Sequence, residues 1–397
     1  MQTKTKQLSI TKIPKRRFKG FAGEWEEKSL GAVSEITSSK RVYLSDYVKA
    51  GIPFFRGKEI SELKKSKTAS NILYIKKSKF IEYKRKFGAP IKNDILITAV
   101  GTIGNIYRVN LNYEFYFKDG NLIWLKNPNV NSSFLEMLLD YHKKDLLKGV
   151  IGSTQKALTI IGIKKVKIPF PLEVAEQQKI ANFLESVDNW LKNLRSQKQA
   201  LKSYKKGIMQ KIFSQQIRFK ADDGGGFPDW EEKTLGECLA YKQPTKFIVK
   251  STEYSNHYKT PVLTAGKSFI LGYTNEIDGI YKNHLPVIIF DDFTTTSQFV
   301  DFPFKVKSSA MKILEAKTDV DIRFIYEAMQ QIKYEIGGHG RHWISIFSNL
   351  SIPTPTLPEQ KKIANFFSSI DNLIESKQKQ ITKAENWKKG LLQQLFV

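Results

Sequence analysis

The chain has 397 residues, more than one ordinary domain holds, which predicts two or three folded units that each bury a core. Its hydrophobic fraction of 41% is that of a folded globular protein, and no apolar run is long enough to predict a membrane span. The net charge of +25 favours a polyanionic partner, nucleic acid rather than membrane, because neither end shows a basic amphipathic helix or lipidation motif. The single cysteine, Cys238, excludes an intramolecular disulfide and fits a reducing cytoplasm, where we expect the protein to reside.

Two halves of the chain begin with the same motif. Trp-Glu-Glu-Lys-Ser-Leu-Gly at Trp25–Gly31 returns as Trp-Glu-Glu-Lys-Thr-Leu-Gly at Trp230–Gly236, an offset of 205 residues. The end of each half is also repeated, since Glu176–Phe183 matches Glu359–Phe366 at an offset of 183 residues. The middles do not match, and the smaller second offset makes the second middle shorter. A repeated scaffold with unlike inserts predicts one task performed on two different targets.

Each middle is predicted to be a mixed α/β domain. Asp94–Thr98 and Val287–Phe290 have the apolar, β-branched composition of buried strands, and Gly and Asn residues around them mark turns. Helices are predicted over Phe134–Leu147 and Ile322–Ile336. The repeated Trp-Glu-Glu-Lys segment is interpreted as a strand that enters each domain.

Long helices follow both middles. Repeated Ile-Pro-x-Pro segments end at Pro171 and Pro355, and a strong helix-forming composition without an internal proline runs from Glu176 to Phe213. Apolar residues then recur at alternating steps of four and three, which is a heptad pattern typical of coiled coils. The predicted seam comprises Ile180, Leu184, Val187, Leu191, Ile208 and Ile212 in the first helix and Ile363, Phe367, Ile370, Ile374, Leu391 and Leu395 in the second. Lys198 interrupts the first seam, and Lys377 and Lys388 interrupt the second. Each helix lying only on its own domain is the alternative.

Connectivity predicts that the helices pair in opposite directions, because the first helix enters the second domain and the second helix leaves it. About 36 residues at ~1.5 Å rise give a spacer of roughly 54 Å, longer than the ~34 Å turn of B-DNA. The expected fold is therefore α+β: two globular mixed α/β domains joined by two long antiparallel coiled-coil helices, as a pseudo-two-fold tandem repeat. The predicted boundaries are a first domain with a basic N-terminal extension over 1–170, a helix over 171–217, a second domain over 218–354 and a second helix over 355–397.

Motifs for catalysis are incomplete. Asn127–Val130 lacks the second proline and the aromatic residue of a methyltransferase loop, and Pro261 stands where a P-loop before Lys267 needs glycine. A metal-dependent nuclease needs an acidic pair followed by Glu-x-Lys on an adjacent strand, and the sequence does not show this arrangement. His339 and His342 have no third metal ligand near them in sequence, so a polar loop is favoured over a zinc site. We expect a non-catalytic chain without a cofactor or metal.

Short basic and polar clusters in predicted turns are the candidate DNA contacts. Lysine and arginine suit phosphate oxygens, whereas threonine and glutamine side chains also suit base edges. A plain hairpin turn is the alternative for Gly101–Gly104. The predicted contacts are Arg56, Lys58, Lys84, Arg85, Thr102, Thr154, Gln155 and Lys156 in the first domain, and Lys267, Thr294, Thr295, Thr296, Arg341 and His342 in the second.

Taken together, these motifs resemble the specificity (S) subunits of Type I restriction-modification systems, over nearly the whole chain. The resemblance rests on the doubled Trp-Glu-Glu-Lys-x-Leu-Gly and Ile-Pro-x-Pro motifs, the doubled Glu-Gln-x-Lys-Ile-Ala-Asn-Phe helix start and the Lys-Gly near each helix end. Phe55–Ile60 and Gly101–Gly104 also look like that family's target-domain turns, whereas the second domain lacks a clear Gly-Thr-Ile-Gly.

The resemblance implies two target recognition domains that each read half of an asymmetric, split site in double-stranded DNA. It further implies that the helices hold two modification subunits, which bind S-adenosylmethionine and methylate adenine, and that two ATP-dependent restriction subunits join for cleavage. S-adenosylmethionine, ATP and Mg are then expected on the partner subunits. The alternative function is an orphan or fused-enzyme-derived DNA-binding adaptor without a restriction partner.

Overall fold

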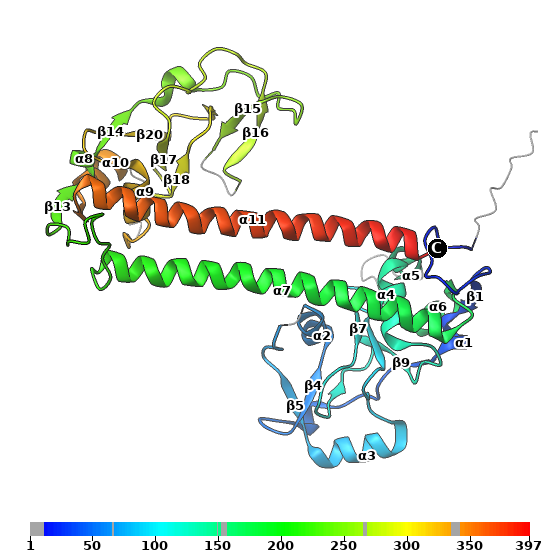
Figure 1. The fold of residues 1–397 in the computed structure, drawn as a ribbon. Helices are drawn as coiled ribbons and strands as arrows, with labels where there is room; N and C mark the ends of the chain where they lie inside the picture. The colour runs from blue at the N-terminus through cyan, green and yellow to red at the C-terminus, as the bar shows by residue number, and fades with distance from the viewer. Residues whose placement is uncertain (1–11, 66, 149, 152–156, 265–267, 335–341) are drawn as a thin grey trace, which may run out of the picture. The chain divides into compact units, whose positions relative to one another are not determined.

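The computed structural model describes residues 12–65, 67–148, 150–151, 157–264, 268–334 and 342–397. The chain divides into two compact units: unit 1 combines residues up to Asn193 with Ile381–Val397, and unit 2 comprises Leu194–Gln380. Two long helices, α7 (Val174–Phe213) and α11 (Leu357–Leu395), each contribute residues to both units (Figure 1).

The repeated motifs pair with one another as two-stranded antiparallel sheets. In unit 1, β1 (Glu26–Ser29) pairs with β12 (Lys167–Phe170). In unit 2, β13 (Glu231–Thr234) pairs with β21 (Ser351–Thr354) in the same register. Each sheet therefore joins the two ends of one variable segment, and short helices follow the first strand: α1 (Leu30–Val33) in unit 1 and α8 (Leu235–Cys238) in unit 2.

The unlike middles share one main sheet topology. Unit 1 contains an antiparallel sheet in the order β2-β9-β6-β7, and unit 2 contains the equivalent sheet β14-β20-β17-β18. The unit 1 strands are β2 (Glu35–Thr37), β9 (Leu122–Lys126), β6 (Ile95–Thr98) and β7 (Ile106–Arg108). The unit 2 strands are β14 (Leu239–Lys242), β20 (Met311–Ala316), β17 (Val287–Asp291) and β18 (Ser297–Val300). The buried inner strands β6 and β17 are the strands that the apolar runs predict.

Each unit also contains a second, smaller sheet, and the elements around this sheet account for the shorter second middle. The order is β3-β5-β4-β8 in unit 1 and β16-β15-β19 in unit 2, and each contains one parallel pair, β4 with β8 and β15 with β19. The strands are β3 (Tyr47–Val48), β5 (Leu73–Ile75), β4 (Ile52–Phe55), β8 (Tyr116–Phe117), β16 (Ile270–Thr274), β15 (Thr260–Leu263) and β19 (Lys305–Val306). Unit 1 adds helix α2 (Gly57–Lys64) between β4 and β5 and helix α3 (Lys77–Phe87) between β5 and β6. The described part of unit 2 has no helix at either place.

Helices α4 (Ser132–Tyr141) and α9 (Ile322–Met329) connect the sheets to the long helices. Asn131 caps α4 by accepting a hydrogen bond from Phe134 N at 2.8 Å, and Asp321 caps α9 in the same way. The helix predicted over Phe134–Leu147 is interrupted at His142, after which α5 (Lys143–Leu147) begins. The helix predicted to reach Ile336 ends at Met329. The remaining short helices are α6 (Ile160–Lys165) and α10 (His342–Ser345), with 3₁₀ turns at Leu44–Asp46, Pro244–Phe247 and Phe347–Asn349.

Within each unit the portions of α7 and α11 pack together, and the predicted antiparallel pairing is confirmed. In unit 2, Lys198 donates to Gln378 and Lys205 to Asp371 at 2.8 Å. Residue numbers therefore increase along one helix as they decrease along the other, which is antiparallel packing. In unit 1, Lys388 donates to Asp188. Lys388 and Asp188 correspond to Lys205 and Asp371 by the offset of 183, so the repeat reuses one interhelical ion pair. The lysine that interrupts the predicted seam at position 388 is thus accommodated by an opposite charge.

Most predicted seam residues are buried. The residues at most 7% exposed are Ile180, Leu184, Val187, Leu191, Ile212, Ile363, Phe367, Ile370, Leu391 and Leu395. Ile208 and Ile374 are only half-buried. In unit 2 the seam residues Ile212 and Ile363 share one apolar cluster with Phe324 of α9, so each seam also packs on its own domain. Helix–helix and helix–domain packing therefore occur together rather than as alternatives.

Candidate nucleic-acid interface

In unit 1, two of the predicted DNA-binding segments lie together at the end of β6, and strand β11 (Ala157–Leu158) adjoins them. A Cβ added at Gly57 would lie 3.6 Å from Thr98 Cγ2 and 3.8 Å from Val100 O, so the Arg56–Lys58 segment adjoins the turn between β6 and β7. Asn105 Nδ2 donates to Ser61 Oγ at 2.8 Å and fixes α2 against the same turn. A third predicted segment joins the strands β10 (Val150–Ile151) and β11, and Leu158 N donates to Ala99 O at 2.9 Å. Thr154, Gln155 and Lys156, predicted in this segment, lie outside the described residues.

The turn between β6 and β7 is held by its own backbone, which leaves the Thr102 side chain exposed. Gly101 and Gly104 have φ angles of +71° and +75°, a conformation that favours glycine. Thr98 Oγ1 donates to Thr102 O and accepts from Asn105 N at 2.8 Å, which closes the turn. The Gly-Thr-Ile-Gly sequence therefore specifies a tight, outward-facing turn that presents Thr102 to solvent.

Arg56 is positioned by a buried partner. Its guanidinium pairs with Glu59, which is 0% exposed, and Arg56 N also donates to Glu59 Oε2 at 2.7 Å. Hydrogen bonding to Glu59 raises the pKa of Arg56 above its ordinary value. The neighbouring Lys58 is 53% exposed and lies 3.8 Å from Glu62. Lys58 is therefore the more available cation of the two, because much of the Arg56 charge is neutralised inside the protein.

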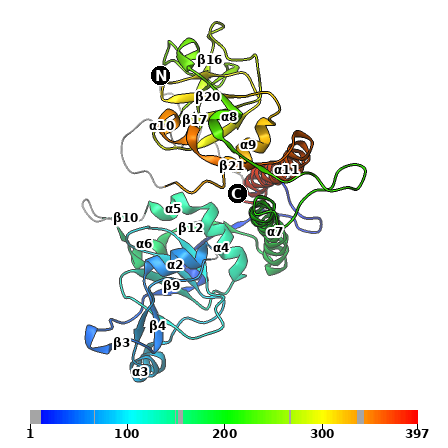
Figure 2. The same ribbon diagram turned by 90° about the vertical axis from the view of Figure 1, so that its left-hand side faces the viewer.

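The predicted contacts Lys84 and Arg85 are not brought to this cluster. Both lie in the last turn of α3, which Figures 1 and 2 draw away from α2 within unit 1. Lys84 pairs with Glu114. Their basic composition alone did not reveal this separation. In the chain, α2 precedes β5 and α3 follows it.

In unit 2, the turn between β17 and β18 occupies the place of the Gly-Thr-Ile-Gly turn. The Asp291 carboxylate accepts hydrogen bonds from Phe293 N at 3.1 Å and from Thr294 Oγ1, and Thr294 Oγ1 lies 2.8 Å from Thr296 Oγ1. Thr295 has a φ angle of +58°. Thr294 and Thr296 are exposed and Thr295 is half-buried, so the predicted threonine cluster forms a polar turn at the equivalent sheet edge.

Asp292 ties this turn to two other segments, a role that the sequence did not reveal. Its Oδ1 accepts from Trp343 N at 2.8 Å, its carbonyl oxygen accepts from His342 N at 3.2 Å, and its amide donates to Ala310 O at 3.0 Å. Its Oδ2 lies 3.3 Å from Lys312 Nζ, and both side chains are at most 2% exposed. The position in unit 1 is Ala99, whose backbone makes the matching bonds to Asn121 and Leu158 without a charged side chain.

The remaining predictions in unit 2 divide between buried and undescribed residues. His342 is 4% exposed, and its Nε2 is buried without a hydrogen-bond partner among the described residues. Its ring packs against Tyr334 at a centroid distance of 5.8 Å, so its side chain faces the interior. Lys267 and Arg341 lie outside the described residues.

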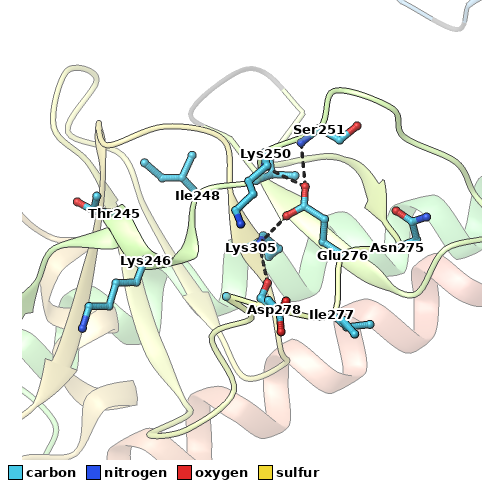
Figure 3. Close-up of a pocket in the computed structure, with 12 residues that line it drawn as sticks. Thr245, Lys246, Ile248, Lys250, Ser251, Asn275, Glu276, Ile277, Asp278 and Lys305 are labelled. Atoms are coloured by element: carbon cyan, nitrogen blue, oxygen red, sulfur yellow. Dashed lines mark hydrogen bonds and ion pairs between the residues drawn. The ribbon is translucent and has the colours of Figure 1, made fainter.

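A cavity of about 860 Å³ lies in unit 2 beside the end of β16 (Figure 3). Glu276 at its wall pairs with the buried Lys305 at 2.7 Å and accepts from Ser251 N and Lys250 N at 2.8 and 2.9 Å. Burial alone would raise the pKa of Glu276, but these hydrogen bonds outweigh it and hold that pKa below its ordinary value. Lys305 also donates to Asp278 O at 2.7 Å. The charges of Glu276 and Lys305 therefore satisfy each other, which is the arrangement of a structural ion pair.

Neither a metal centre nor a membrane span is found in the described part of the chain. No group of three His, Cys, Asp or Glu side chains there is arranged to hold a metal ion. None of the helices described is both long and apolar enough to cross a bilayer.

Comparison with known proteins agrees with the repeat. The family model "Type I restriction modification DNA specificity domain" matches twice, at residues 22–203 and 228–386. The putative type I restriction enzyme MjaX specificity subunit of Methanocaldococcus jannaschii is 26% identical over 98% of this chain and 95% of its own length. The EcoR124I/EcoR124II specificity subunit of Escherichia coli is 46% identical over 146 residues, but this match spans only 36% of either protein.

A solved structure shares the fold. The crystal structure of a Type-I restriction-modification system S subunit from M. genitalium superposes with a TM-score of 0.65 at 18% identity, covering 97% of this chain and 99% of that one. The relatives are named as specificity subunits, which confirms the prediction of a specificity subunit rather than a catalytic one.

Proposed function

Because the chain belongs to the family of Type I restriction modification DNA specificity domains, we propose that it reads an asymmetric, bipartite site in double-stranded DNA, one half-site per unit. In this proposal the recognition domains span 1–170 and 218–354, and helices over 171–217 and 355–397 act as the spacer. Adenine methylation and ATP-dependent cleavage belong to partner subunits: two modification subunits and two restriction subunits.

The observation that carries the proposal is the repetition of one loop framework with different side chains. In both units, the residue after the inner strand accepts a backbone hydrogen bond from a distant segment: Ala99 from Leu158, and Asp292 from His342. The exposed threonine of unit 1, Thr102, lies in a Gly-Thr-Ile-Gly turn, whereas the turn of unit 2 contains three successive threonines. Equal frameworks with unequal side chains are what two half-sites of unlike sequence require, because base edges are distinguished by side-chain donors and acceptors.

The net charge of +25 supports the same partner. Lysine and arginine in excess bind phosphates without regard to sequence and speed association with DNA, while the polar turns supply sequence choice. S-adenosylmethionine, ATP and Mg are assigned to the partner subunits, in keeping with the incomplete catalytic motifs of this chain.

The long helices support the spacer role. Each is an unbroken helix, with 40 residues in α7 and 39 in α11, so each is about 60 Å long at ~1.5 Å per residue. A spacer of that length allows the two half-sites to lie more than one turn of B-DNA (~34 Å) apart, with unread base pairs between them.

Mapping of methylated adenines tests the proposal. Host genomes are sequenced with and without this chain, in the presence of its modification subunits. We expect methylation at a split motif only when the chain is present, and loss of one half of the motif when the turn at Thr294–Thr296 is replaced by alanine. An unchanged methylation pattern without the chain contradicts the proposal, whereas DNA binding by the chain without any associated methylation favours the orphan adaptor.

A further inference from the structure

The turn between β17 and β18 carries an exposed aromatic side chain among its threonines. Phe293 follows Asp292 directly and is 49% exposed. Single exposed apolar side chains are common on protein surfaces, so exposure alone assigns no role to this ring. Its place distinguishes it, because the same turn offers Thr294 and Thr296 to DNA in the proposed function. The ring of Phe293 is therefore presented to the same half-site as the threonines.

The backbone of Phe293 is held on both sides. Its N–H donates to Asp291 Oδ1 at 3.1 Å, and Thr295 N donates to Asp291 O at 2.9 Å. The preceding residue, Asp292, is 1% exposed and accepts a hydrogen bond from Trp343 N. A ring on so fixed a backbone retains only its two side-chain torsions, so little conformational entropy is lost when it makes a contact.

Unit 1 has no ring at the corresponding position. Val100 follows Ala99 in unit 1 as Phe293 follows Asp292 in unit 2, and the valine is half-buried. The next residue in unit 1 is Gly101, which adds no side chain. At this turn the ring is a feature of unit 2 and not of unit 1, as expected of a group that distinguishes one half-site from the other.

The shape of the turn favours the major groove of DNA. β17 and β18 form an antiparallel hairpin whose last pair before the turn is Phe290 with Ser297, and β18 is the edge strand of its sheet. A two-stranded ribbon enters the major groove, which is ~12 Å wide, whereas the minor groove is only ~6 Å wide. Gln298 on β18 is also exposed, and its amide offers a donor and an acceptor to base edges. The hairpin therefore combines polar groups and one apolar ring for contact with the major groove.

The chemistry of a phenylalanine ring indicates which base it contacts. Among the groups that base pairs display in the major groove, the C5-methyl of thymine is the apolar one, and phenylalanine is suited to contact it. We propose that Phe293 contacts the C5-methyl of one thymine in the second half-site and so selects thymine at that position. This inference rests on the proposed function and names one base for which unit 2 is selective. A wedge between base steps is the other use of an exposed ring, and it is typical of minor-groove binders.

Removal of a single methyl group from the DNA tests the contact. After mapping of methylated adenines has given the split motif, duplexes are made in which each thymine of the second half-site in turn is replaced by deoxyuridine, which lacks only the C5-methyl. Binding is measured by fluorescence anisotropy for the chain in complex with its modification subunits. One replacement should weaken wild-type binding about fourfold, because one methyl group is then no longer buried against the protein.

Substitution of the ring shows whether Phe293 is the group that contacts this methyl. Phe293→Ala should bind the thymine and deoxyuridine duplexes equally, and Phe293→Val, which installs the residue of unit 1, should lose most of the difference. Ile277→Ala is the matched control, since it removes an 84% exposed apolar side chain from another loop of unit 2, and it should keep the difference. Deoxyuridine in the first half-site should affect the wild type and Phe293→Ala alike.

Thermal unfolding first shows that each variant is folded, and Phe293→Val carries the comparison if Phe293→Ala is not. Equal sensitivity of the wild type and the folded variants to every deoxyuridine, or a second half-site without thymine on either strand, overturns the inference. DNA bending by the wild type that Phe293→Ala abolishes, without loss on any deoxyuridine duplex, also overturns it, in favour of a wedge. Failure of the proposed function is distinct, because the wild-type complex would then bind no split site.

Discussion

Asp292 and Ala99 occupy the same place in the two units, yet only Asp292 brings a buried charge to the recognition turn. Breaking a buried ion pair by removing one partner costs about 3–5 kcal/mol, because the other charge stays buried and unpaired. Asp292→Asn and Lys312→Met should therefore each lower the free energy of unfolding, measured by denaturant titration. The double variant Asp292→Ala/Lys312→Met should recover much of that loss, since no charge is left buried.

Binding separates the positioning role of Asp292 from its contribution to stability. In the double variant Trp343 N loses its acceptor, so we expect weaker binding to the second half-site and unchanged binding to the first, measured on DNA with one half-site scrambled. Asp301→Asn, at an exposed residue of the same unit, is the control. If the refolded double variant binds both half-sites as the wild type does, Asp292 only stabilises the fold.

Lys58 offers a cleaner test of the first half-site than Arg56, whose removal would leave Glu59 buried without its partner. Lys58→Gln should weaken binding to DNA severalfold and reduce the slope of log affinity against log salt by about 1, because one phosphate contact is lost. The matched control is Lys86→Gln, which also removes an exposed lysine from an i,i+4 ion pair, but on α3. Equal losses from both variants would place DNA along α3 as well and contradict the cluster described around Gly57.

The sequence predicted turns better than it predicted which side chains face outward. Gly101 and Gly104 have positive φ angles, so the turn that they form follows from local chain geometry. The burial of His342 and the charge pairing of Arg56 depend instead on residues that fold against them, Tyr334 and Glu59. No local pattern around either residue carries that information, because the partners are chosen by tertiary packing.

At the scale of elements, heptad spacing was sufficient to predict two long paired helices, and the connectivity of the chain predicted that they run antiparallel. The topology of the domains was not predictable in the same way, since the middles share little sequence although their main sheets have the same strand order. Strand order is set by which apolar faces are buried together, and many sequences satisfy one such pattern. The repeated glutamates explain part of the framework: Glu176 pairs with Arg17 and Glu359 with Arg218, both at 2.7 Å.

Lengthening both helices should change the separation of the half-sites that is recognised. Seven residues inserted after Leu194 in α7 and seven after Gln380 in α11 preserve the heptad register and extend each helix by about 10 Å. We expect the preferred separation to increase by about three base pairs, at ~3.4 Å each, measured by binding to a series of DNA spacers. Four residues inserted after Leu194 alone shift one seam against the other and should abolish recognition of the native spacing. An unchanged spacing preference in the seven-residue variant contradicts the spacer role.

At the scale of the whole molecule, the repeat indicates that the recognition segments are interchangeable. Leu30 N bonds to Val166 O and Leu235 N to Leu350 O, both at 2.9 Å, so each variable segment leaves and rejoins the same two-stranded sheet at the same points. Replacing 235–350 by a copy of 30–166 preserves these connections. The copy also brings an equivalent aromatic contact: Phe134 packs on Phe396 in unit 1, as Phe324 packs on Phe213 in unit 2.

Such a chain should read a palindromic site, because two identical recognition segments on antiparallel helices face the two DNA strands in opposite directions. Some stability will be lost, since Glu327 and Arg323 no longer pair with Lys205 and Asp371, so unfolding must be measured first. Sequencing of methylated adenines then shows which half-site is used: two inverted copies of the first half-site are expected. A folded chimera that still directs methylation to the original asymmetric site would mean that the variable segments do not choose the sequence.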